Sequence, residues 1–275
     1  MDLYCVMGNP IHHSKSPWIH ARFAELTGQS LHYGSRLIPP NGFAAEVKAF
    51  FSEGGHGCNI TVPFKFEAAA LANHHSQRAT LATAANMLTL QGGKLMADNT
   101  DGAGLVKDIE YNAGVQLRGS HLLLIGAGGA AAGVLGPLLL AGPASITVAN
   151  RTLAKAGDLV ARHAALAAQQ RTELRAQDLQ TLTSTFDVLI NATASSLTGG
   201  AIPVAASTLK PGALAYDMMY GSAAQGFMNW AQEHGARPRD GLGMLVEQAA
   251  EAFMIWRGIR PPAQQVLAEL RRLVA

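Results

Sequence analysis

The sequence contains very little cysteine. Cys5 and Cys58 are the only two cysteines in 275 residues, too few for the disulfide framework of a small secreted domain. Neither lies in the paired Cys and His spacing of a zinc site, so no metal is predicted. A reducing, cytoplasmic location is the default for such a chain.

Long apolar runs and clusters of one charge are also missing. The most apolar stretch, 133–141, contains Pro137 and is far shorter than the roughly 20 residues that cross a bilayer. The N-terminus lacks the pattern of a signal peptide. The formal net charge is only +2, without a run of Lys and Arg, which argues against nucleic acid. A small-molecule ligand without a membrane partner is therefore expected, and a homodimer is left open.

The first hundred residues alternate short strands with helices. Apolar residues make up 48% of the chain and its length suffices for two medium domains. We expect strands at 3–7, 32–38 and 58–62, helices at 17–26, 41–51 and from Pro63, and a hairpin of 87–90 with 94–97 around Gly92-Gly93. This pattern predicts a small α/β domain.

The middle of the chain changes character. A linking helix at 101–112, closed by Gly114, leads to apolar runs that predict buried strands at 121–125, 145–149, 187–190 and 213–216, with helices at 130–141 and 152–168. This alternation is typical of a Rossmann-type, doubly wound parallel sheet. Tail helices at 245–256 and 262–273 are expected to pack on the first domain. The predicted domains are 1–101, completed by 242–275, and 102–241.

A glycine-rich loop follows the first of these buried strands. The run Gly126-Ala127-Gly128-Gly129-Ala130-Ala131 has the G-x-G-x-x-A form of the dinucleotide-binding fingerprint. Gly126 permits the tight turn, Gly128 lets the backbone approach a pyrophosphate, and Ala131 lets the helix pack close to the strand. Free N–H groups at the helix start then bind phosphates. A plain strand–helix turn is the alternative, because a glycine-rich match alone is a weak signal.

The end of the next strand predicts which dinucleotide is bound. An NAD-binding protein carries Asp or Glu there to bind the ribose hydroxyl, whereas this chain has Asn150-Arg151-Thr152. The planar guanidinium of Arg151 can stack on the adenine and pair with a 2′-phosphate, and Lys155 adds positive charge. We therefore predict NADP, with a solvated basic residue as the alternative.

Lys65 and Asp101 are the candidate catalytic pair. Lys65 lies just inside the helix that opens at Pro63, where the helix dipole disfavours an ammonium group and so favours proton transfer. Asp101 lies at the start of the linking helix, where a carboxylate is stabilised. The alternatives are a surface lysine and a helix cap formed by Asn99 or Thr100. Composition and spacing lead no further than a two-domain NADP-binding protein, most simply an oxidoreductase.

Several short motifs run through the chain in a fixed order. They are Met7-Gly8-Asn9-Pro10-Ile11, His13-Ser14-Lys15-Ser16-Pro17, Asn59-Ile60-Thr61-Val62-Pro63-Phe64-Lys65, Asp98-Asn99-Thr100-Asp101-Gly102, Asn150-Arg151-Thr152, Tyr216-Asp217-Met218-Met219-Tyr220, and Asp240-Gly241-Leu242-Gly243-Met244-Leu245-Val246 with Gln248. Together they resemble the NADP-dependent shikimate dehydrogenase family along the whole chain. The resemblance implies an enzyme of the chorismate pathway that reversibly reduces 3-dehydroshikimate to shikimate with NADPH.

The resemblance also implies a role for each matching residue. Lys65 would exchange a proton with the reacting oxygen, and Asp101 would orient both the lysine and the substrate hydroxyl. Ser14 and Ser16, with Tyr220, would bind the carboxylate, and the ring hydroxyls would contact Thr61, Asn86, Asp101 and Gln248. The cofactor would be held by Gly126, Ala127, Gly128, Gly129, Ala130, Asn150, Arg151, Thr152, Lys155, Met218 and Gly241.

Purely structural interpretations of these residues stay open. Either serine could cap a helix, Asn86 could be a turn residue, and Tyr220 could belong to the core. The chain also departs from the family pattern at His12, Met87, Ala132 and Gln225-Gly226-Phe227. A dehydrogenase of quinate or an amino analogue, a slower paralogue, and a catalytically weak NADP-binding sensor are therefore alternatives.

Overall fold

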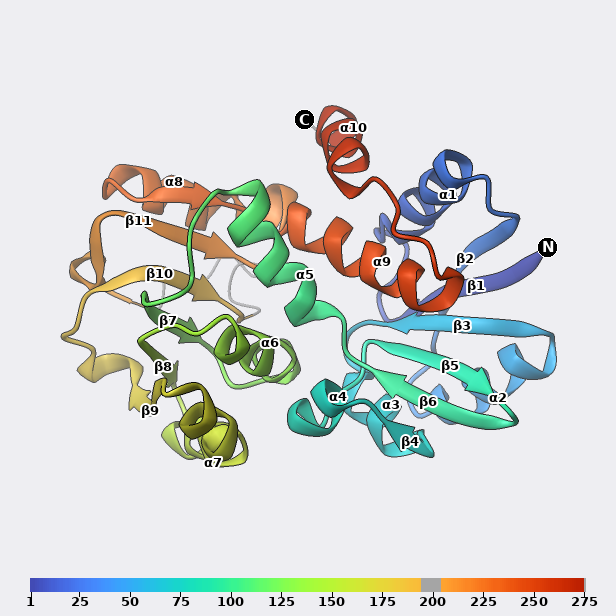
Figure 1. The fold of residues 1–275 in the computed structure, drawn as a ribbon, viewed down its shortest axis with the longest axis horizontal. Helices are drawn as coiled ribbons and strands as arrows, with labels where there is room; N and C mark the ends of the chain where they lie inside the picture. The colour runs from blue at the N-terminus through green and yellow to red at the C-terminus, as the bar shows by residue number, and fades with distance from the viewer. Residues whose placement is uncertain (194–203, 275) are drawn as a thin grey trace. The chain divides into compact units, whose positions relative to one another are not determined.

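The computed structural model describes residues 1–193 and 204–274. The chain divides into two compact units, one formed by residues 1–104 with 245–275 and the other by residues 105–244 (Figure 1). Helices α5 (Asp101–Lys107) and α9 (Leu242–Arg257) each begin in one unit and end in the other. Within the described ranges, no helix combines the length and the apolar character needed to cross a bilayer.

The first unit is built on a mixed six-stranded sheet in the order β2-β1-β3-β5-β6-β4 (Figure 1). Strand β1 pairs parallel with both of its neighbours, and the hairpin β5-β6 begins with β5 antiparallel to β3. The strands are β1 (Asp2–Gly8), β2 (Leu31–Leu37), β3 (Gly55–Ile60), β4 (His74–His75), β5 (Met87–Gln91) and β6 (Lys94–Asp98). The helices of this unit, besides parts of α5 and α9, are α1 (Ser16–Thr27), α2 (Phe43–Ser52), α3 (Lys65–Leu71), α4 (Gln77–Ala82) and α10 (Ala263–Val274).

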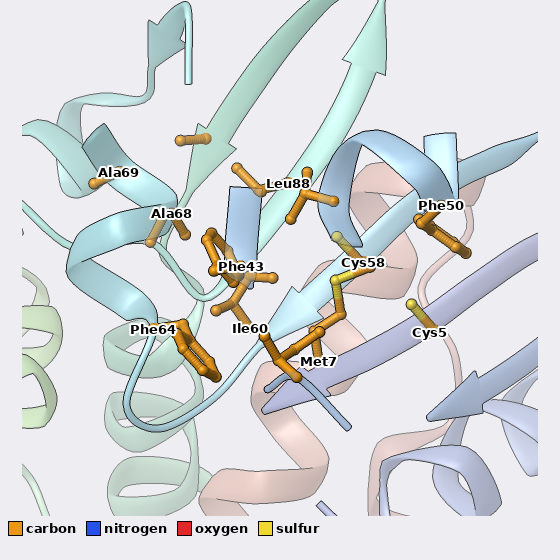
Figure 2. Packing of buried hydrophobic residues seen from close by; sticks show 14 residues of the cluster. Cys5, Met7, Phe43, Phe50, Cys58, Ile60, Phe64, Ala68, Ala69 and Leu88 are labelled. Carbon is orange, nitrogen blue, oxygen red and sulfur yellow. The ribbon is translucent and has the colours of Figure 1, made fainter. Parts of the chain in front are cut away.

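Strand β1 is buried on both faces of this sheet. Because side chains alternate along a strand, Cys5 and Met7 enter one core and Tyr4 and Val6 enter the other. The first core packs β1, β3 and β5 against α2 and α3, and Figure 2 shows its side chains. The rings of Phe43 and Phe64 stack there with centroids 5.2 Å apart. Burial on both faces explains why this strand reads as an uninterrupted apolar run.

The second core holds an aromatic cluster that joins the C-terminal helices to the sheet. Trp256 of α9 lies 4.7 Å from the ring of Tyr4, and its Nε1 donates to Thr89 Oγ1 at 3.0 Å. A Cβ atom at Gly57 would lie 2.6 Å from the Trp256 ring, so only glycine leaves room for it. Arg22 of α1 adds a bidentate ion pair with Glu269 of α10.

The second unit contains a parallel six-stranded sheet in the order β12-β11-β10-β7-β8-β9. Counted from β7, this is the 3-2-1-4-5-6 order of a doubly wound dinucleotide-binding fold. Its strands are β7 (His121–Ile125), β8 (Ser145–Asn150), β9 (Glu173–Asp178), β10 (Phe186–Asn191), β11 (Leu209–Asp217) and β12 (Arg237–Arg239). The principal helices are α6 (Gly129–Leu140), α7 (Leu153–Gln170) and α8 (Gln225–Glu233). Residues 122–125 of β7 are fully buried, as the apolar run predicted.

The predicted boundaries are wrong around Pro63 and after Lys107. Strand β3 ends at Ile60 and α3 begins at Lys65, because residues 61–64 form a turn closed by Phe64 N–H on Thr61 C=O at 3.1 Å. The predicted helix at 101–112 is α-helical only to Lys107 and continues as a π-helix over Asp108–Asn112. The periodicity of the sequence gives no signal for this change from α-helix to π-helix. The change coincides with tertiary contacts made by Asp108.

Some short elements were not predicted from the sequence. Strand β9 has the sequence ELRAQD at the sheet edge, so it lacks the apolar run of its neighbours. Strand β12, also at an edge, contains Pro238, and a proline in a segment argues against predicting a strand there. The remaining unpredicted elements of the described ranges are β4, α4, α8 and the short 3₁₀ turns at Leu179–Thr181, Ala206–Thr208 and Gly221–Ala224.

His20 gives the first unit a predictable acid sensitivity. The side chain is buried in the aromatic cluster, and burial lowers the pKa of His20 from 6.5 to about 3. The unfolded chain therefore binds a proton below about pH 6.5 that the folded chain does not. As the pH is lowered from about 6.5 towards 3, we expect the unfolding free energy to decrease, by up to about 1.4 kcal/mol per pH unit from this group. His20→Phe should flatten the dependence by a comparable amount.

Urea unfolding of wild type and His20→Phe between pH 4.5 and 7 measures this difference directly. Taking the difference cancels the contributions of His163, whose pKa burial also lowers, and of the carboxylates. Parallel pH curves for the two proteins would contradict the assignment.

Candidate active site

Lys65 and Asp101 meet in the first unit. The Lys65 Nζ atom lies 2.6 Å from Asp101 Oδ2, with the lysine side chain 16% and the aspartate side chain 7% exposed. Lys65 is the first residue of α3 and Asp101 the first residue of α5. The pair is therefore a largely desolvated ion pair that still reaches solvent, as a group that exchanges protons with a ligand must.

Asn86 binds the other carboxylate oxygen of Asp101. Its Nδ2 lies 2.8 Å from Asp101 Oδ1, 2.9 Å from Thr100 Oγ1 and 3.2 Å from Gln248 Oε1. The Thr100 backbone N–H donates to Asn86 Oδ1 at 2.8 Å, which fixes which end of the amide faces the aspartate. Gln248 comes from α9, so a third segment contacts Asn86, while Lys65 and Asn86 themselves bind the carboxylate.

Hydrogen bonds within the aspartate motif hold Asp101 in place. The Asp101 N–H donates to Asn99 Oδ1 at 3.2 Å, and Asn99 Nδ2 donates to Ala84 C=O at 3.0 Å. The Asn99 side chain thus accepts the first N–H of α5, and Asp101 still pairs with the lysine. Asp98 anchors the motif through two bonds from Arg78, at 2.7 and 2.9 Å. Burial alone would raise the pKa of Asp98, but these bonds hold that pKa below its ordinary value.

The two N-terminal motifs lie against one another. Asn9 N–H donates to Val62 C=O at 3.0 Å, and Thr61 N–H to Met7 C=O at 2.9 Å. A Cβ atom at Gly8 would lie 2.3 Å from Thr61 Cγ2, so the close approach requires glycine. Thr61 therefore lies beside the loop that leads to Ser14 and Ser16.

Ser14 and Ser16 flank the first turn of α1. Lys15 occupies the N-cap, and the Ser14 hydroxyl accepts the Ser16 N–H at 3.3 Å. Ser16 is buried and Ser14 is partly exposed. Tyr220 belongs to the second unit, where it follows β11, and burial raises the pKa of its hydroxyl.

The glycine-rich loop of the second unit has the geometry of a phosphate cradle. Gly126 has φ +111, and a Cβ atom there would lie 3.2 Å from Ala192 C=O. Gly128 is the N-cap of α6, and a Cβ atom there would meet nothing within 4 Å, so its face is open. The first N–H groups of α6, from Gly129 and Ala130 onward, have no partner within the helix because a helix leaves its first turn unpaired. With Ala127, these residues fit a pyrophosphate.

The residues after β8 form an exposed basic corner. Asn150 Nδ2 donates to Thr152 C=O at 2.9 Å, which shapes the turn into α7. Arg151, Thr152 and Lys155 are exposed. In the described part of the chain, no carboxylate pairs with Arg151, so its charge is available to an anion.

Met218 and Gly241 are in direct backbone contact. A Cβ atom at Gly241 would lie 2.3 Å from the Met218 carbonyl oxygen, and the Gly241 N–H donates to Met219 C=O at 2.8 Å. Met218 N–H donates in turn to Asn191 C=O at 3.0 Å. The carboxyl ends of β10, β11 and β12 are thus tied together at the edge where doubly wound sheets bind ligands.

A buried charge cluster that the sequence did not predict supports this edge. Arg239 donates to Asp108 Oδ2 at 2.8 Å and to Oδ1 at 2.5 Å, and Tyr216 OH donates to Oδ2 at 2.7 Å. A Cβ atom at Gly243 would lie 1.8 Å from Asp108 Oδ1. Asp108 begins the π-helix, so the cluster lies where the helix changes geometry. Only the glycine motif around Gly243 was available as a signal.

Among residues 1–193 and 204–274, no group of three or more His, Cys, Asp and Glu side chains is arranged to hold a metal ion.

Three family models match the chain. Residues 6–88 match the shikimate dehydrogenase substrate binding domain, residues 109–199 match shikimate / quinate 5-dehydrogenase, and residues 241–271 match the shikimate 5′-dehydrogenase C-terminal domain. The matched segments lie in the order of the motifs noted in the sequence and cover most of it.

Individual relatives cover the chain almost completely. The shikimate dehydrogenase (NADP(+)) of Acidovorax sp. (strain JS42) is 66% identical over 274 residues, which is 100% of this chain and 97% of the relative. The crystal structure of an Ael1 enzyme from Pseudomonas putida has a TM-score of 0.90 and 46% identity, covering 98% of each chain. Shikimate 5-dehydrogenase of Thermus thermophilus in complex with shikimate has a TM-score of 0.85 and 30% identity, covering 100% of this chain and 99% of that one.

The close contact between Gly241 and Met218 leads to a prediction about the stability of the folded protein. Gly241→Ala should lower the unfolding free energy by about 1 to 3 kcal/mol, because the new methyl group overlaps a backbone carbonyl that cannot move freely. Gly157→Ala is the matched control: it lies inside α7, a Cβ atom there meets nothing within 4 Å, and alanine favours the helix. Chemical denaturation of the three proteins tests this, and equal midpoints for both variants would contradict it.

Proposed function

The chain belongs to the shikimate dehydrogenase family, and on that premise we propose how its residues perform the reaction. The protein is an NADP-dependent oxidoreductase that interconverts shikimate and 3-dehydroshikimate. The observation that carries the residue assignment is the ion pair between Lys65 and Asp101, with Asn86 on the second carboxylate oxygen.

Lys65 is proposed as the proton-transfer residue. During reduction its ammonium group donates a proton to the oxygen that becomes the hydroxyl, and during oxidation its amine accepts that proton. Asp101 holds the Nζ atom at 2.6 Å and keeps it pointed to one place. Its own second oxygen is occupied by Asn86, so the carboxylate cannot swing away. The pair therefore supplies both a proton and its orientation.

The substrate is proposed to bind in the first unit by hydrogen bonds. The hydroxyls of Ser14 and Ser16 suit a carboxylate, since they donate without adding charge. Tyr220, which belongs to the second unit, is proposed as a further hydroxyl donor to the carboxylate. Thr61, Asn86, Asp101 and Gln248 are proposed to contact the ring hydroxyls. Such a site rejects analogues that lack a hydroxyl, because its own buried polar groups would stay unpaired.

The glycine cradle and the basic corner of the second unit fit NADP. When bound, this cofactor accepts or donates the hydride. We propose that Gly126, Ala127, Gly128, Gly129 and Ala130 hold its pyrophosphate on the N-terminus of α6. Asn150, Arg151, Thr152 and Lys155 are proposed to hold the 2′-phosphate end, and Met218 and Gly241 to line the nicotinamide half.

The choice of substrate within the family is tested by a panel. The matching model for residues 109–199 covers both shikimate and quinate dehydrogenases, so quinate is the rival that a specific observation favours. A cytoplasmic location and a homodimer remain predictions from the sequence. Size-exclusion chromatography with light scattering decides the second of these.

Lys65→Ala should lose nearly all turnover. Removing a positioned proton-transfer group lowers kcat by a factor on the order of 10² to 10⁴. NADP binding should stay unchanged, since Lys65 lies outside the proposed cofactor residues. Initial rates of NADP reduction with shikimate and with quinate, together with a fluorescence titration of NADPH, measure both quantities.

Lys94→Ala is the control for that experiment, because Lys94 is an exposed lysine of the same unit at the start of β6. Full activity of Lys65→Ala would refute the proton-transfer role. Faster oxidation of quinate than of shikimate by wild type would leave the residue roles intact and change the substrate. Absence of turnover with both substrates, despite tight NADPH binding, would favour a sensor.

Arg151→Ala should weaken NADP binding about tenfold or more and weaken NAD binding far less. The loss follows from removing a charge-assisted contact to the 2′-phosphate, which NAD lacks. Arg162→Ala removes an exposed arginine from α7, the helix that follows Arg151, and should alter neither affinity. If both variants weaken NADP equally, the effect comes from net charge and not from a specific contact.

A further inference from the structure

A line of buried side chains leads from the aromatic cluster to Asp101. The Tyr33 hydroxyl on β2 donates to Asn59 Oδ1 at 2.7 Å, and Asn59 Nδ2 on β3 donates to the Asn86 carbonyl oxygen at 3.2 Å. Asn86 Nδ2 then donates to Asp101 Oδ1 at 2.8 Å. Tyr33, Asn59 and Asn86 are 6%, 5% and 2% exposed, so water competes little for these bonds.

Tyr33 reaches Asn59 across an intervening strand. Strand β1 lies between β2 and β3, and neighbouring strands are about 4.8 Å apart, so the contact spans close to 10 Å. A tyrosine side chain with its hydroxyl covers most of that distance. The strand order is visible in Figure 1. Neither a shorter polar residue nor phenylalanine in the same place could donate to Asn59.

The orientation of the Asn59 amide depends on both of its partners. The Asn86 carbonyl can only accept a hydrogen bond, so Nδ2 must face it and Oδ1 must face Tyr33. Removing the tyrosine hydroxyl would take away the 2.7 Å hydrogen bond on that buried oxygen and weaken the preference for this amide orientation. Asn86 would then lose one of the bonds on its carbonyl, which also accepts the Ile60 N–H at 2.7 Å.

The cluster around Tyr33 keeps the hydroxyl in place. The imidazole of His20 stacks on the phenol ring at 4.1 Å with an angle of 3° between the planes, and Trp256 lies 6.4 Å away. Burial raises the pKa of Tyr33 well above its ordinary value, so the hydroxyl remains a donor throughout the neutral range. The tyrosine is therefore a fixed and permanently protonated donor.

We propose that Tyr33 is a positioning residue for the reaction: through Asn59 and Asn86 it sets the place of Asp101, and hence of Lys65, relative to the substrate. This inference rests on the proposed roles of Lys65 and Asp101. Tyr33 touches neither member of the pair, so it reaches Asp101 through the intermediate amides; its hydroxyl also interacts with the side chain of Ser16.

The test compares Tyr33→Phe with Tyr4→Phe. Tyr4 is the register partner of Tyr33 on β1, is equally buried and belongs to the same aromatic cluster, but its hydroxyl contacts Arg257 and not Asn59. We expect Tyr33→Phe to lower kcat by on the order of ten- to a hundredfold through loss of alignment, with KM for NADP unchanged. Tyr4→Phe should keep kcat within about twofold of wild type.

A double-mutant cycle separates positioning from general destabilisation. In an Asp101→Asn background, adding Tyr33→Phe should change kcat by less than about twofold, because the residue it positions is already lost. Rates are measured well below the thermal midpoint of each variant, on protein whose folding is verified by circular dichroism.

Three results would overturn the proposal: wild-type kcat in Tyr33→Phe, an equal loss in Tyr4→Phe, or the same loss of kcat in both backgrounds. If Lys65→Ala also keeps full turnover, the proposed function itself fails. If Lys65→Ala is inactive and Tyr33→Phe is fully active, only the positioning role fails.

Discussion

The ion pair between Lys65 and Asp101 is the contact on which the rest of the first unit depends. Two charges that are 16% and 7% exposed are costly unless each is held by further polar groups. Asn86 provides the bond to the second carboxylate oxygen, and Thr100 and Gln248 hold Asn86. The sheet register, the turn after β3 and the placement of α9 all serve to bring these groups together. The same hydrogen bonds that stabilise the ion pair also hold the Lys65 Nζ atom in one position.

The second unit solves a different problem, the close approach of backbone to backbone. Gly126, Gly241 and Gly243 each lie where a Cβ atom would crowd a neighbouring carbonyl or carboxylate. Because these glycines lack a side chain, the strand ends can approach neighbouring backbone closely. The first N–H groups of α6 then remain without a partner inside the helix. Asp108, buried with Arg239 and Tyr216, holds the same edge from the side of the π-helix. Side-chain amides therefore surround the ion pair of the first unit, whereas close main-chain contacts shape the strand ends of the second.

Support for the site comes from residues that carry no chemistry of their own. Tyr33, Asn59 and Asp98 lie outside the Lys65–Asp101 ion pair and are linked to it through hydrogen bonds of neighbouring residues. The bonds of Tyr33 and Asn59 are buried, so a lost partner there leaves an unsatisfied polar group. Such residues decide how firmly a site is held, and they look like ordinary core or turn residues in the sequence.

By itself, the sequence determined the Rossmann-type unit, the glycine loop, the absence of an acid after β8, and the motifs that identify the family. These features are local: apolar runs, turn residues and short spacings carry them. The tertiary structure alone decided that Lys65 and Asp101 meet and that Asp108 pairs with Arg239. It also decided that hydrogen bonds through Asn86 link Tyr33 and Asn59 to Asp101. These contacts join residues far apart in the chain, and their partners are chosen by sheet register and by the need to satisfy buried polar groups. Edge elements such as β9 and β12 were missed for the same reason, because pairing with a neighbour and not their own composition makes them strands.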